Sequence, residues 1–256
     1  MAACDLEGKG ILVTRTSTQS AGLCRLIESH GGRAEQFPAL EIKPSRDSDT
    51  ARSALLQVYD LVIFISPNAV RYASDLLSGE RISAKQFCAV GRATAERLTE
   101  AGYSIDLIPD DRYDSEGLLA LPALQQMAGR QVLIVRGEGG RTLLADTLRA
   151  RGAKVGYAEV YRRLKPEVDS APLLRDWPTK IDLVTTTSAE VLENLVDMLG
   201  IKGWPLLRLT PLLVISARMR EAARQRGFET ILQADGADDA SIFASICEWV
   251  SEDNGR

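Results

Sequence analysis

The feature that most constrains the fold is a regular alternation of short apolar segments with helical segments. Near-continuous apolar strands separated by helices are typical of parallel sheets that are covered on both faces. Residues 20–29 show the helical pattern, with Leu23, Leu26 and Ile27 on one face and a glycine pair that stops the helix. The predicted strands are residues 11–15, 61–65, 87–90, 105–108, 132–136, 183–187, 212–215 and 230–233. The sequence therefore predicts an α/β fold with parallel sheets.

The alternation also repeats once along the chain. Residues 11–15 match residues 132–136, and residues 60–66 match residues 182–188, in the same order in both halves. Such self-similarity indicates duplication of a five-strand α/β unit rather than a short-period solenoid. A chain of 256 residues is long enough for two such units, since a domain usually holds about 100–200 residues. Two similar lobes are therefore predicted.

Two segments at matching places break the pattern. Residues 37–44 and 157–166 are extended in character, and each ends in Lys-Pro. Proline keeps the residue before it out of the helical region, so both segments should be extended. Paired extended connectors between the lobes are the natural interpretation.

Composition excludes several classes of protein. The chain has 31 Lys+Arg, 35 Asp+Glu and a formal net charge of -4, which gives no reason to expect nucleic acid as a partner. Its one histidine, His30, excludes histidine-rich metal sites, and its place at a helix end favours a structural role. The N-terminus does not resemble a signal peptide, and no apolar run approaches the roughly 20 residues that span a bilayer. We expect a cytoplasmic protein with no membrane partner.

The cysteines carry no recognisable motif. No two are close enough in sequence for a Cys-x-x-Cys pair, so zinc ribbons and redox motifs are unsupported. We expect four buried free thiols in a reducing compartment. They are Cys4, Cys24, Cys88 and Cys247.

Hydroxyls, glycines and arginines follow the predicted strands. Ligands of open α/β sheets bind beyond the carboxyl ends of the strands, and the N–H groups of the helices that begin there attract anions. Two interpretations stay open: the hydroxyls are only helix caps, or the turns together form a cleft for several anionic groups. The residues concerned are Arg15, Ser66, Asn68, Arg92, Thr94, Arg136, Ser188 and Ser216.

The turn after residues 132–136 is rich in glycine. Residues 137–140 lack the third glycine of a dinucleotide fingerprint and the Lys-Ser/Thr of a P-loop, so they are a weak nucleotide signal. A loop of this kind, beginning at Gly137, lets a ligand carboxylate approach backbone N–H groups. It lies in the basic part of the chain, because residues 130–165 hold nine basic and three acidic residues. The carboxylates of Asp114 and Asp238 are predicted to cap helices.

Several of these segments, taken in order, resemble the uroporphyrinogen-III synthase family. Each segment is weak alone, and their order and spacing are specific together. The resemblance covers nearly the whole chain. It rests on residues 14–15, 65–70, 89–95, 113–118, 135–137 and 159–161.

The resemblance implies a particular form of the α/β fold. Two flavodoxin-like lobes with parallel sheets would be joined by a two-stranded β-ladder linker. One lobe would be discontinuous. Here residues 1–37 and 167–256 would form the first lobe and residues 45–156 the second, with residues 38–44 and 157–166 as inter-lobe connectors.

The resemblance also implies a reaction. The family cyclises hydroxymethylbilane with loss of water and inversion of the last pyrrole ring, and it needs no metal or organic cofactor. Tyr161 matches the tyrosine that the family associates with departure of the hydroxyl. Its alternative role is packing within the ladder. Tyr157 is the alternative candidate for the catalytic tyrosine. The substrate carboxylates would bind to the turn residues above, including Gly137. The protein is expected to be a monomer that contacts the preceding pathway enzyme transiently.

Two other classes fit part of the pattern. A two-lobed cytoplasmic binding protein for a small polyanionic ligand also closes two α/β lobes on an anion. A tandem of receiver-like signalling domains needs an acidic cluster after the first strand and an aspartate at a central strand end. Those places hold Thr14, Arg15, Ser66 and Ser188, which disfavours the signalling class.

Overall fold

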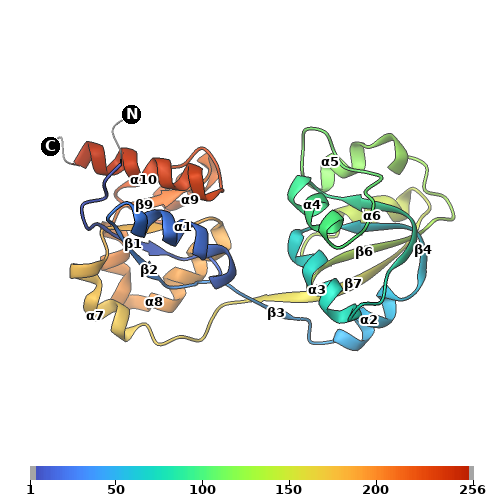
Figure 1. Cartoon of the computed structure of the whole chain (residues 1–256), viewed down its shortest axis with the longest axis horizontal. Coiled ribbons are helices and arrows are strands. Elements are labelled where there is room, and N and C mark those ends of the chain that lie inside the picture. Colours follow the sequence, from blue (N-terminus) through green and yellow to red (C-terminus); the bar gives the residue numbers. More distant parts are fainter. Residues whose placement is uncertain (1–3, 254–256) are drawn as a thin grey trace. The chain divides into compact units, whose positions relative to one another are not determined.

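The computed structural model describes residues 4–253 and separates two compact units (Figure 1). Lobe 1 is formed by residues up to Glu41 and from Leu164 onward, and lobe 2 by Ile42–Arg163. The chain thus passes between the lobes at residues 41/42 and 163/164. One lobe is continuous, and the other is built from both ends of the chain.

Lobe 1 holds a five-stranded sheet whose paired strands run parallel. Its strand order is β10-β9-β8-β1-β2. The strands are β1 (Gly10–Val13), β2 (Arg33–Gln36), β8 (Leu183–Thr185), β9 (Leu212–Val214) and β10 (Ile231–Gln233). The helices are α1 (Ser17–Ser29), α7 (Ala171–Lys180), α8 (Ala189–Leu209), α9 (Ala217–Gln225) and α10 (Asp239–Asp253).

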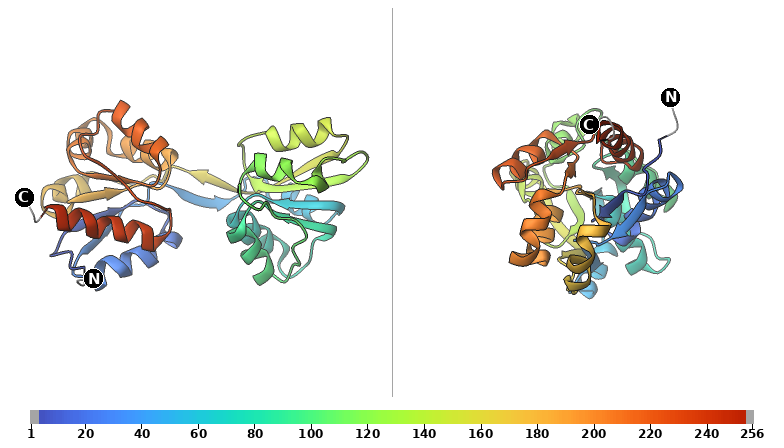
Figure 2. Two further views of the ribbon diagram at one scale, coloured as in Figure 1. Left: turned by 90° about the horizontal axis from the view of Figure 1, so that it is seen from above. Right: turned by 90° about the vertical axis from the view of Figure 1, so that its left-hand side faces the viewer.

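Both faces of this sheet are buried. Leu12 contributes to an apolar cluster with α7, α8 and α9, while its neighbours Ile11 and Val13 face a second cluster with α1 and α10. Successive strand residues point to opposite faces, so a strand covered on both sides must be apolar throughout. Helices flank the sheet on both sides in Figure 2. The continuous apolar runs in the sequence follow from this burial.

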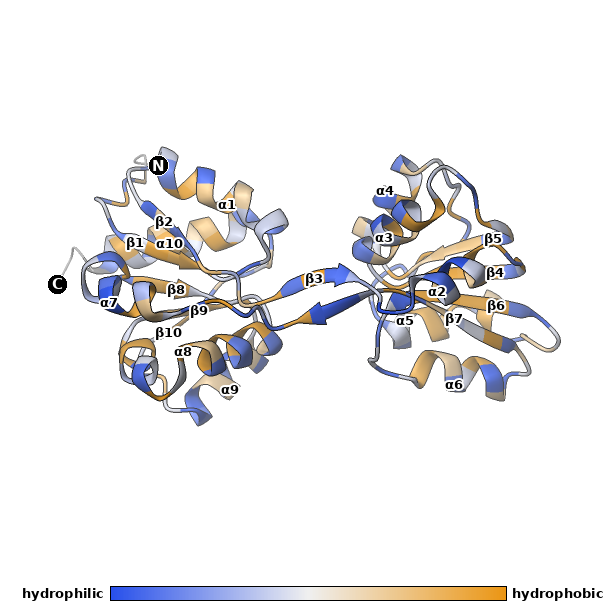
Figure 3. Ribbon diagram, turned by 90° about the horizontal axis from the view of Figure 1, so that it is seen from below, coloured by the Kyte–Doolittle hydropathy of each residue, from blue (hydrophilic) through white to orange (hydrophobic). Residues whose placement is uncertain are grey.

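Lobe 2 repeats the arrangement with a second five-stranded sheet, ordered β3-β7-β6-β4-β5. Its strands are β3 (Glu41–Pro44), β4 (Val58–Phe64), β5 (Ser83–Ala89), β6 (Gln131–Gly137) and β7 (Lys154–Leu164). Its helices are α2 (Ser48–Leu55), α3 (Pro67–Leu77), α4 (Arg92–Glu100), α5 (Ser115–Ala120) and α6 (Leu143–Ala150), with a short 3-10 turn at Pro122–Leu124. Apolar residues concentrate on the strands of both sheets (Figure 3).

The central strand β4 shows how lobe 2 is packed. Val62 and Phe64 face the cluster under α2, α3 and α4, and Leu61 and Ile63 face the cluster under α5 and α6. All four are at most 1% exposed. Complete burial of side chains of this size is worth about 1.5–3 kcal/mol each. The strand therefore anchors the two layers of helices to each other.

The predicted duplication has a counterpart in the strand orders. β8-β1-β2 of lobe 1 corresponds to β4-β6-β7 of lobe 2, and β9 corresponds to β5. The fifth strands of the two sheets do not correspond, because β10 of lobe 1 has no equivalent in lobe 2. The predicted strand at residues 105–108 is wrong. The segment meets β5 at one β-bridge, Leu107 with Cys88, and through backbone hydrogen bonds to Phe87 and Ala89. A continuous ladder does not form, and the Phe87 N–H donates to the Asp106 carboxylate at 2.7 Å rather than to a backbone carbonyl. β3 supplies the fifth strand from the opposite edge of the sheet.

The expectation of four free thiols is also wrong. Cys4 and Cys247 form a disulfide that connects the segment before β1 to α10, and their Cα atoms are 5.8 Å apart. The residues are 243 positions apart, so sequence spacing gave no sign of the pair. Cys24 and Cys88 are buried and free, as expected, and burial raises the pKa of the Cys88 thiol to about 12. Among residues 4–253, no helix combines the length and apolar character needed to cross a bilayer.

The disulfide should stabilise lobe 1. A cross-link that closes so long a segment restricts the unfolded chain, and loss of such a bond typically costs about 2–5 kcal/mol. We expect Cys247→Ser to lower the urea midpoint, and reductant to lower that of the wild-type protein to the same value. The Cys247→Ser variant is its own control, because reductant should leave its midpoint unchanged. Equal midpoints for oxidised wild-type protein and the variant would contradict the prediction.

Candidate active site

Serine caps begin three helices at the carboxyl ends of the strands. Ser66 accepts a hydrogen bond from the Ala69 N–H at 3.1 Å and caps α3. Ser188 caps α8 and Ser216 caps α9 through the same contact, at 3.1 and 3.3 Å. The capping interpretation is confirmed for these three serines. Capping uses a lone pair of the serine oxygen, so each hydroxyl proton stays available to another acceptor.

The turn after β5 is built differently. Gly91, not Thr94, is the N-cap of α4, and Thr94 lies inside the helix with 2% of its surface exposed. The capping interpretation of Thr94 is therefore wrong. Arg92 is exposed in the first turn of α4, where its guanidinium lies 5.7 Å from the Tyr113 ring centroid. Asn68 is in the first turn of α3 and partly exposed.

Arg15 is held inside lobe 1. Its guanidinium donates to the Asp239 carboxylate and to the Ala237 carbonyl, and the residue is 7% exposed. These partners lie at the start of α10, Ala237 just before the helix and Asp239 as its first residue. Asp238 accepts the Ser241 N–H there at 2.9 Å, as predicted for a cap. Part of the positive charge that the sequence offered to a ligand is thus neutralised by the protein itself.

Arg136 and the loop that follows it also bond within their own lobe. Arg136 donates to the carbonyls of Gly137 and Arg141 at 3.1 and 3.2 Å and lies 3.4 Å from the Glu159 carboxylate. The N–H groups of the glycine loop were predicted to bind a ligand carboxylate. Gly139 donates to Glu159 at 3.2 Å, so a protein carboxylate stands where a ligand carboxylate was expected. This role of Glu159 was not predicted, although residues 159–161 carry part of the family resemblance, because its place opposite Arg136 is set by the pairing of β7 with β6.

A shift of register between β6 and β7 sets the direction of Tyr161. Arg136 pairs with Glu159, but the next residue, Gly137, pairs with Tyr161. The extra residue in β7 is a β-bulge, which turns the following side chain to the other face of the sheet. Val160 and Tyr161, although adjacent, consequently both face the cluster under α2, α3 and α4. Tyr161 thus belongs to the sheet of lobe 2.

The Tyr161 ring occupies space that only glycine leaves open. A Cβ atom on Gly137 would lie 2.6 Å from Cε2 of Tyr161 and 2.7 Å from its Cζ, far inside van der Waals contact. The ring also lies 5.8 Å from the Tyr72 ring, centroid to centroid. Tyr161 is 1% exposed. The phenol is therefore fixed by packing rather than by its hydrogen bond alone.

The Tyr161 hydroxyl reaches the N-terminus of α3. Its oxygen lies 3.1 Å from Oγ of Ser66, and Ser66 is only partly buried. The positive end of the helix dipole stabilises negative charge that develops nearby. Two neutral hydroxyls at this place can donate protons without a buried charge in the resting state. This pair is the strongest candidate for proton chemistry among the predicted site residues.

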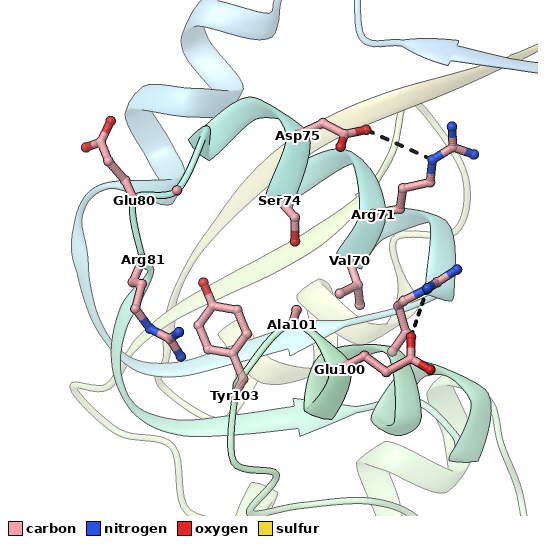
Figure 4. A pocket seen from close by; sticks show the side chains of 11 residues that line it. Val70, Arg71, Ser74, Asp75, Glu80, Arg81, Glu100, Ala101 and Tyr103 are labelled. Atoms are coloured by element: carbon pink, nitrogen blue, oxygen red, sulfur yellow. Dashed lines mark hydrogen bonds and ion pairs between the residues drawn. The ribbon is translucent and has the colours of Figure 1, made fainter.

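Two pockets of lobe 2 have different chemistry. One of about 560 Å³ lies over α3 and α4 (Figure 4). Two of its arginines form ion pairs with acidic neighbours, Arg97 with Glu100 at 2.8 Å and Arg71 with Asp75 at 4.0 Å, and the third, Arg81, donates to the Gly102 carbonyl. None of the predicted site residues lines it. Its charges are already balanced, so nothing in it calls for an anionic ligand.

The second pocket, about 540 Å³, borders the glycine loop. Its lining includes Glu138, which accepts from the Arg46 N–H at 2.6 Å and from the Ser45 hydroxyl at 2.9 Å. These hydrogen bonds, the first above all, hold the pKa of the Glu138 carboxyl below its ordinary value. Within residues 4–253, no group of three or more His, Cys, Asp or Glu side chains is placed to hold a metal ion.

Comparison with known proteins gives one consistent result. The family model described as uroporphyrinogen-III synthase HemD matches residues 22–244. The uroporphyrinogen-III synthases of Salmonella typhimurium and Escherichia coli are each 37% identical over 246 residues, which cover 92% of this chain and 99% of those proteins.

Solved structures agree in fold. A mutant uroporphyrinogen III synthase from Thermus thermophilus superposes with a TM-score of 0.66 at 18% identity, over 97% of this chain and all of that one. The Helicobacter pylori uroporphyrinogen-III synthetase gives a TM-score of 0.59 at 12% identity, over 96% and 99% of the two chains. These likenesses support the two-sheet α/β fold.

Replacement of Gly137 tests the packing of Tyr161. We expect Gly137→Ala to lower the free energy of unfolding by about 1–3 kcal/mol, because the new methyl group overlaps the ring. Gly156→Ala is the matched control on β7, where a Cβ meets only Leu133 Cδ1 at 3.9 Å and should be neutral or slightly stabilising. Urea denaturation measures both. Equal stability of the two variants would show that the Tyr161 ring is not confined in this way.

Proposed function

Since the chain belongs to the uroporphyrinogen-III synthase family, we propose that it converts hydroxymethylbilane to uroporphyrinogen III. In this reaction the linear tetrapyrrole loses water, its last pyrrole ring is inverted, and the macrocycle closes, so the enzyme acts as a hydro-lyase. The observation within the structure that supports the proposal best is the Tyr161–Ser66 hydroxyl pair at the start of α3. It supplies a neutral proton donor where a hydroxyl must leave.

The chemistry of the substrate explains why so little catalytic apparatus is needed. The departing hydroxyl is attached to the methylene of an electron-rich pyrrole, whose nitrogen lone pair pushes it out and leaves an azafulvene cation. Substrate and product differ by one water molecule, so no electron acceptor or donor is consumed, and we propose that no cofactor takes part. Selectivity then depends on holding the chain so that the inverted ring closes. A hydroxyl aimed at the leaving oxygen assists the first step.

We assign the carboxylate groups of the substrate to the turns at the ends of the strands. Asn68 and Arg92 are the best placed in lobe 2, because both are at least partly exposed in the first turns of their helices. Arg15 and Arg136 would bind substrate carboxylates through those guanidinium N–H groups that do not already donate to partners within the protein. Further proposed donors, alone or through adjacent N–H groups, are Ser66, Thr94, Gly137, Ser188 and Ser216.

The finer architecture is part of the same proposal. Residues 1–37 with 167–256 and residues 45–156 would act as two flavodoxin-like lobes, and residues 38–44 and 157–166 as the ladder between them. The enzyme would work as a cytoplasmic monomer and receive its unstable substrate in transient contact with the enzyme that makes it.

The test is conversion of freshly formed hydroxymethylbilane by the purified protein, with the product isomers separated. The proposal requires the type III isomer. A protein that only binds the polyanion would leave the spontaneous type I isomer as the sole product, and that result would reject the proposal.

The role of Tyr161 is tested by removing its hydroxyl. We expect Tyr161→Phe to slow formation of the type III isomer by about 10²-fold, the usual contribution of a positioned proton donor, with little change in stability. Tyr59→Phe is the matched control, because the Tyr59 hydroxyl is in the same lobe and donates to the Ala54 carbonyl at 2.8 Å. Full activity of Tyr161→Phe, measured as type III isomer formed per minute, would remove Tyr161 from the mechanism.

A further inference from the structure

The proposed donor, Tyr161, is the more deeply buried of the two residues. Tyr161 is 1% exposed, with its ring packed against Gly137 and near the Tyr72 ring, whereas Ser66 is only partly buried. A ligand that approaches from solvent therefore reaches Ser66 before it reaches the phenol. Direct contact of the substrate with Tyr161 is therefore sterically less accessible than direct contact with Ser66.

The hydrogen bonds of Ser66 leave its proton free when Tyr161 is the donor between the two hydroxyls. A hydroxyl oxygen has two lone pairs and one proton. One lone pair of Ser66 accepts the Ala69 N–H at 3.1 Å, and the Tyr161 oxygen, also at 3.1 Å, can donate to the other. Both acceptor positions are then filled from within lobe 2. With the hydrogen bond in this direction, the Ser66 proton is left available to a third partner.

Resting on the function proposed above, we propose that Ser66 is a further catalytic residue. It donates its proton to the departing hydroxyl, and Tyr161 donates its own proton to Ser66 in turn. In the first step the C–O bond breaks with its electron pair on oxygen, and that oxygen takes the Ser66 proton to become water. Ser66 takes the Tyr161 proton, and the phenolate faces the positive end of α3. After ring closure the pyrrole α-carbon loses a proton, which returns through Ser66 to Tyr161, so no proton is gained or lost overall.

The two residues need each other for a physical reason. A serine hydroxyl alone is too weak an acid to give up its proton, whereas a phenol is a much stronger one. The phenol alone is too deeply buried to present its proton to a large substrate. When one hydrogen bond couples them, the partly exposed Ser66 can donate a proton that the more acidic Tyr161 replaces. This coupling distinguishes a relay from two independent donors.

A double-mutant cycle tests the relay. We expect Ser66→Gly and Tyr161→Phe to lower kcat for the type III isomer by similar factors, about 10²-fold, with KM changed less. Glycine is well tolerated as an N-cap, so Ser66→Gly should fold as the wild-type protein does. The double variant should be no slower than the slower single variant, because residues that act as one unit are not additive. Ser66→Thr, which keeps a hydroxyl and the cap, should restore most of the lost kcat.

The controls separate the possible failures. Asp47→Ala removes the cap of α2 in the same lobe, where Asp47 accepts the Thr50 N–H at 3.0 Å, and should keep wild-type kcat. Wild-type kcat in Ser66→Gly, or losses that multiply in the double variant, would overturn the relay and leave the proposed function standing. Failure of the wild-type protein itself to form the type III isomer would overturn the proposed function instead.

Discussion

A single extra residue in β7 decides what the site of lobe 2 can do. The β-bulge between the pairs Arg136–Glu159 and Gly137–Tyr161 moves the phenol to the face of the sheet that carries α3. Without the bulge, Tyr161 would point to the same side as Glu159, away from Ser66. Because the strand is hydrogen-bonded within the sheet, the bulge can hold the side chain more firmly than a loop could. The candidate chemistry thus depends on backbone pairing before it depends on side chains.

Equivalent strands of the two lobes end in matching serine caps. Ser66 follows β4 and Ser188 follows β8, the equivalent strand of the other lobe, and both cap the next helix through the N–H three residues later. The capping requirement alone accounts for a serine at each place. In lobe 2 the bulge adds a phenol to one of these caps. Of the two caps, Ser66 has a phenol as a hydrogen-bond partner, which suits it for proton transfer.

The sequence was informative where structure is local. Apolar runs gave seven of the eight predicted strands, since burial of both faces of a sheet leaves no room for polar alternation. The serine caps were predictable from the strand–serine–helix order. Thr94 was not, because Gly91 takes the cap position and Tyr113 lies against it, where a Cβ on Gly91 would be 3.0 Å from Cβ of Tyr113.

Features that depend on distant residues were missed. Arg15 bonds Asp239, 224 residues away, and Cys4 bonds Cys247, so neither partner could be read from spacing. The bulge was hidden for a similar reason, because it exists only in the pairing of β7 with β6. Sequence reasoning therefore found Tyr161 through resemblance alone and expected it on a connector. Its burial and its contact with Ser66 became visible only in the folded lobe.

The most direct measurement is a crystal structure of the protein with its cyclic tetrapyrrole product bound. We predict that the bridging carbon from which the hydroxyl departed lies at Ser66, within direct or one-water reach of its Oγ, with the Tyr161 hydroxyl bonded to Ser66 on the side away from the ligand. A product whose bridging carbon lies beyond reach of Ser66, or a Tyr161 turned away from α3, would contradict this prediction.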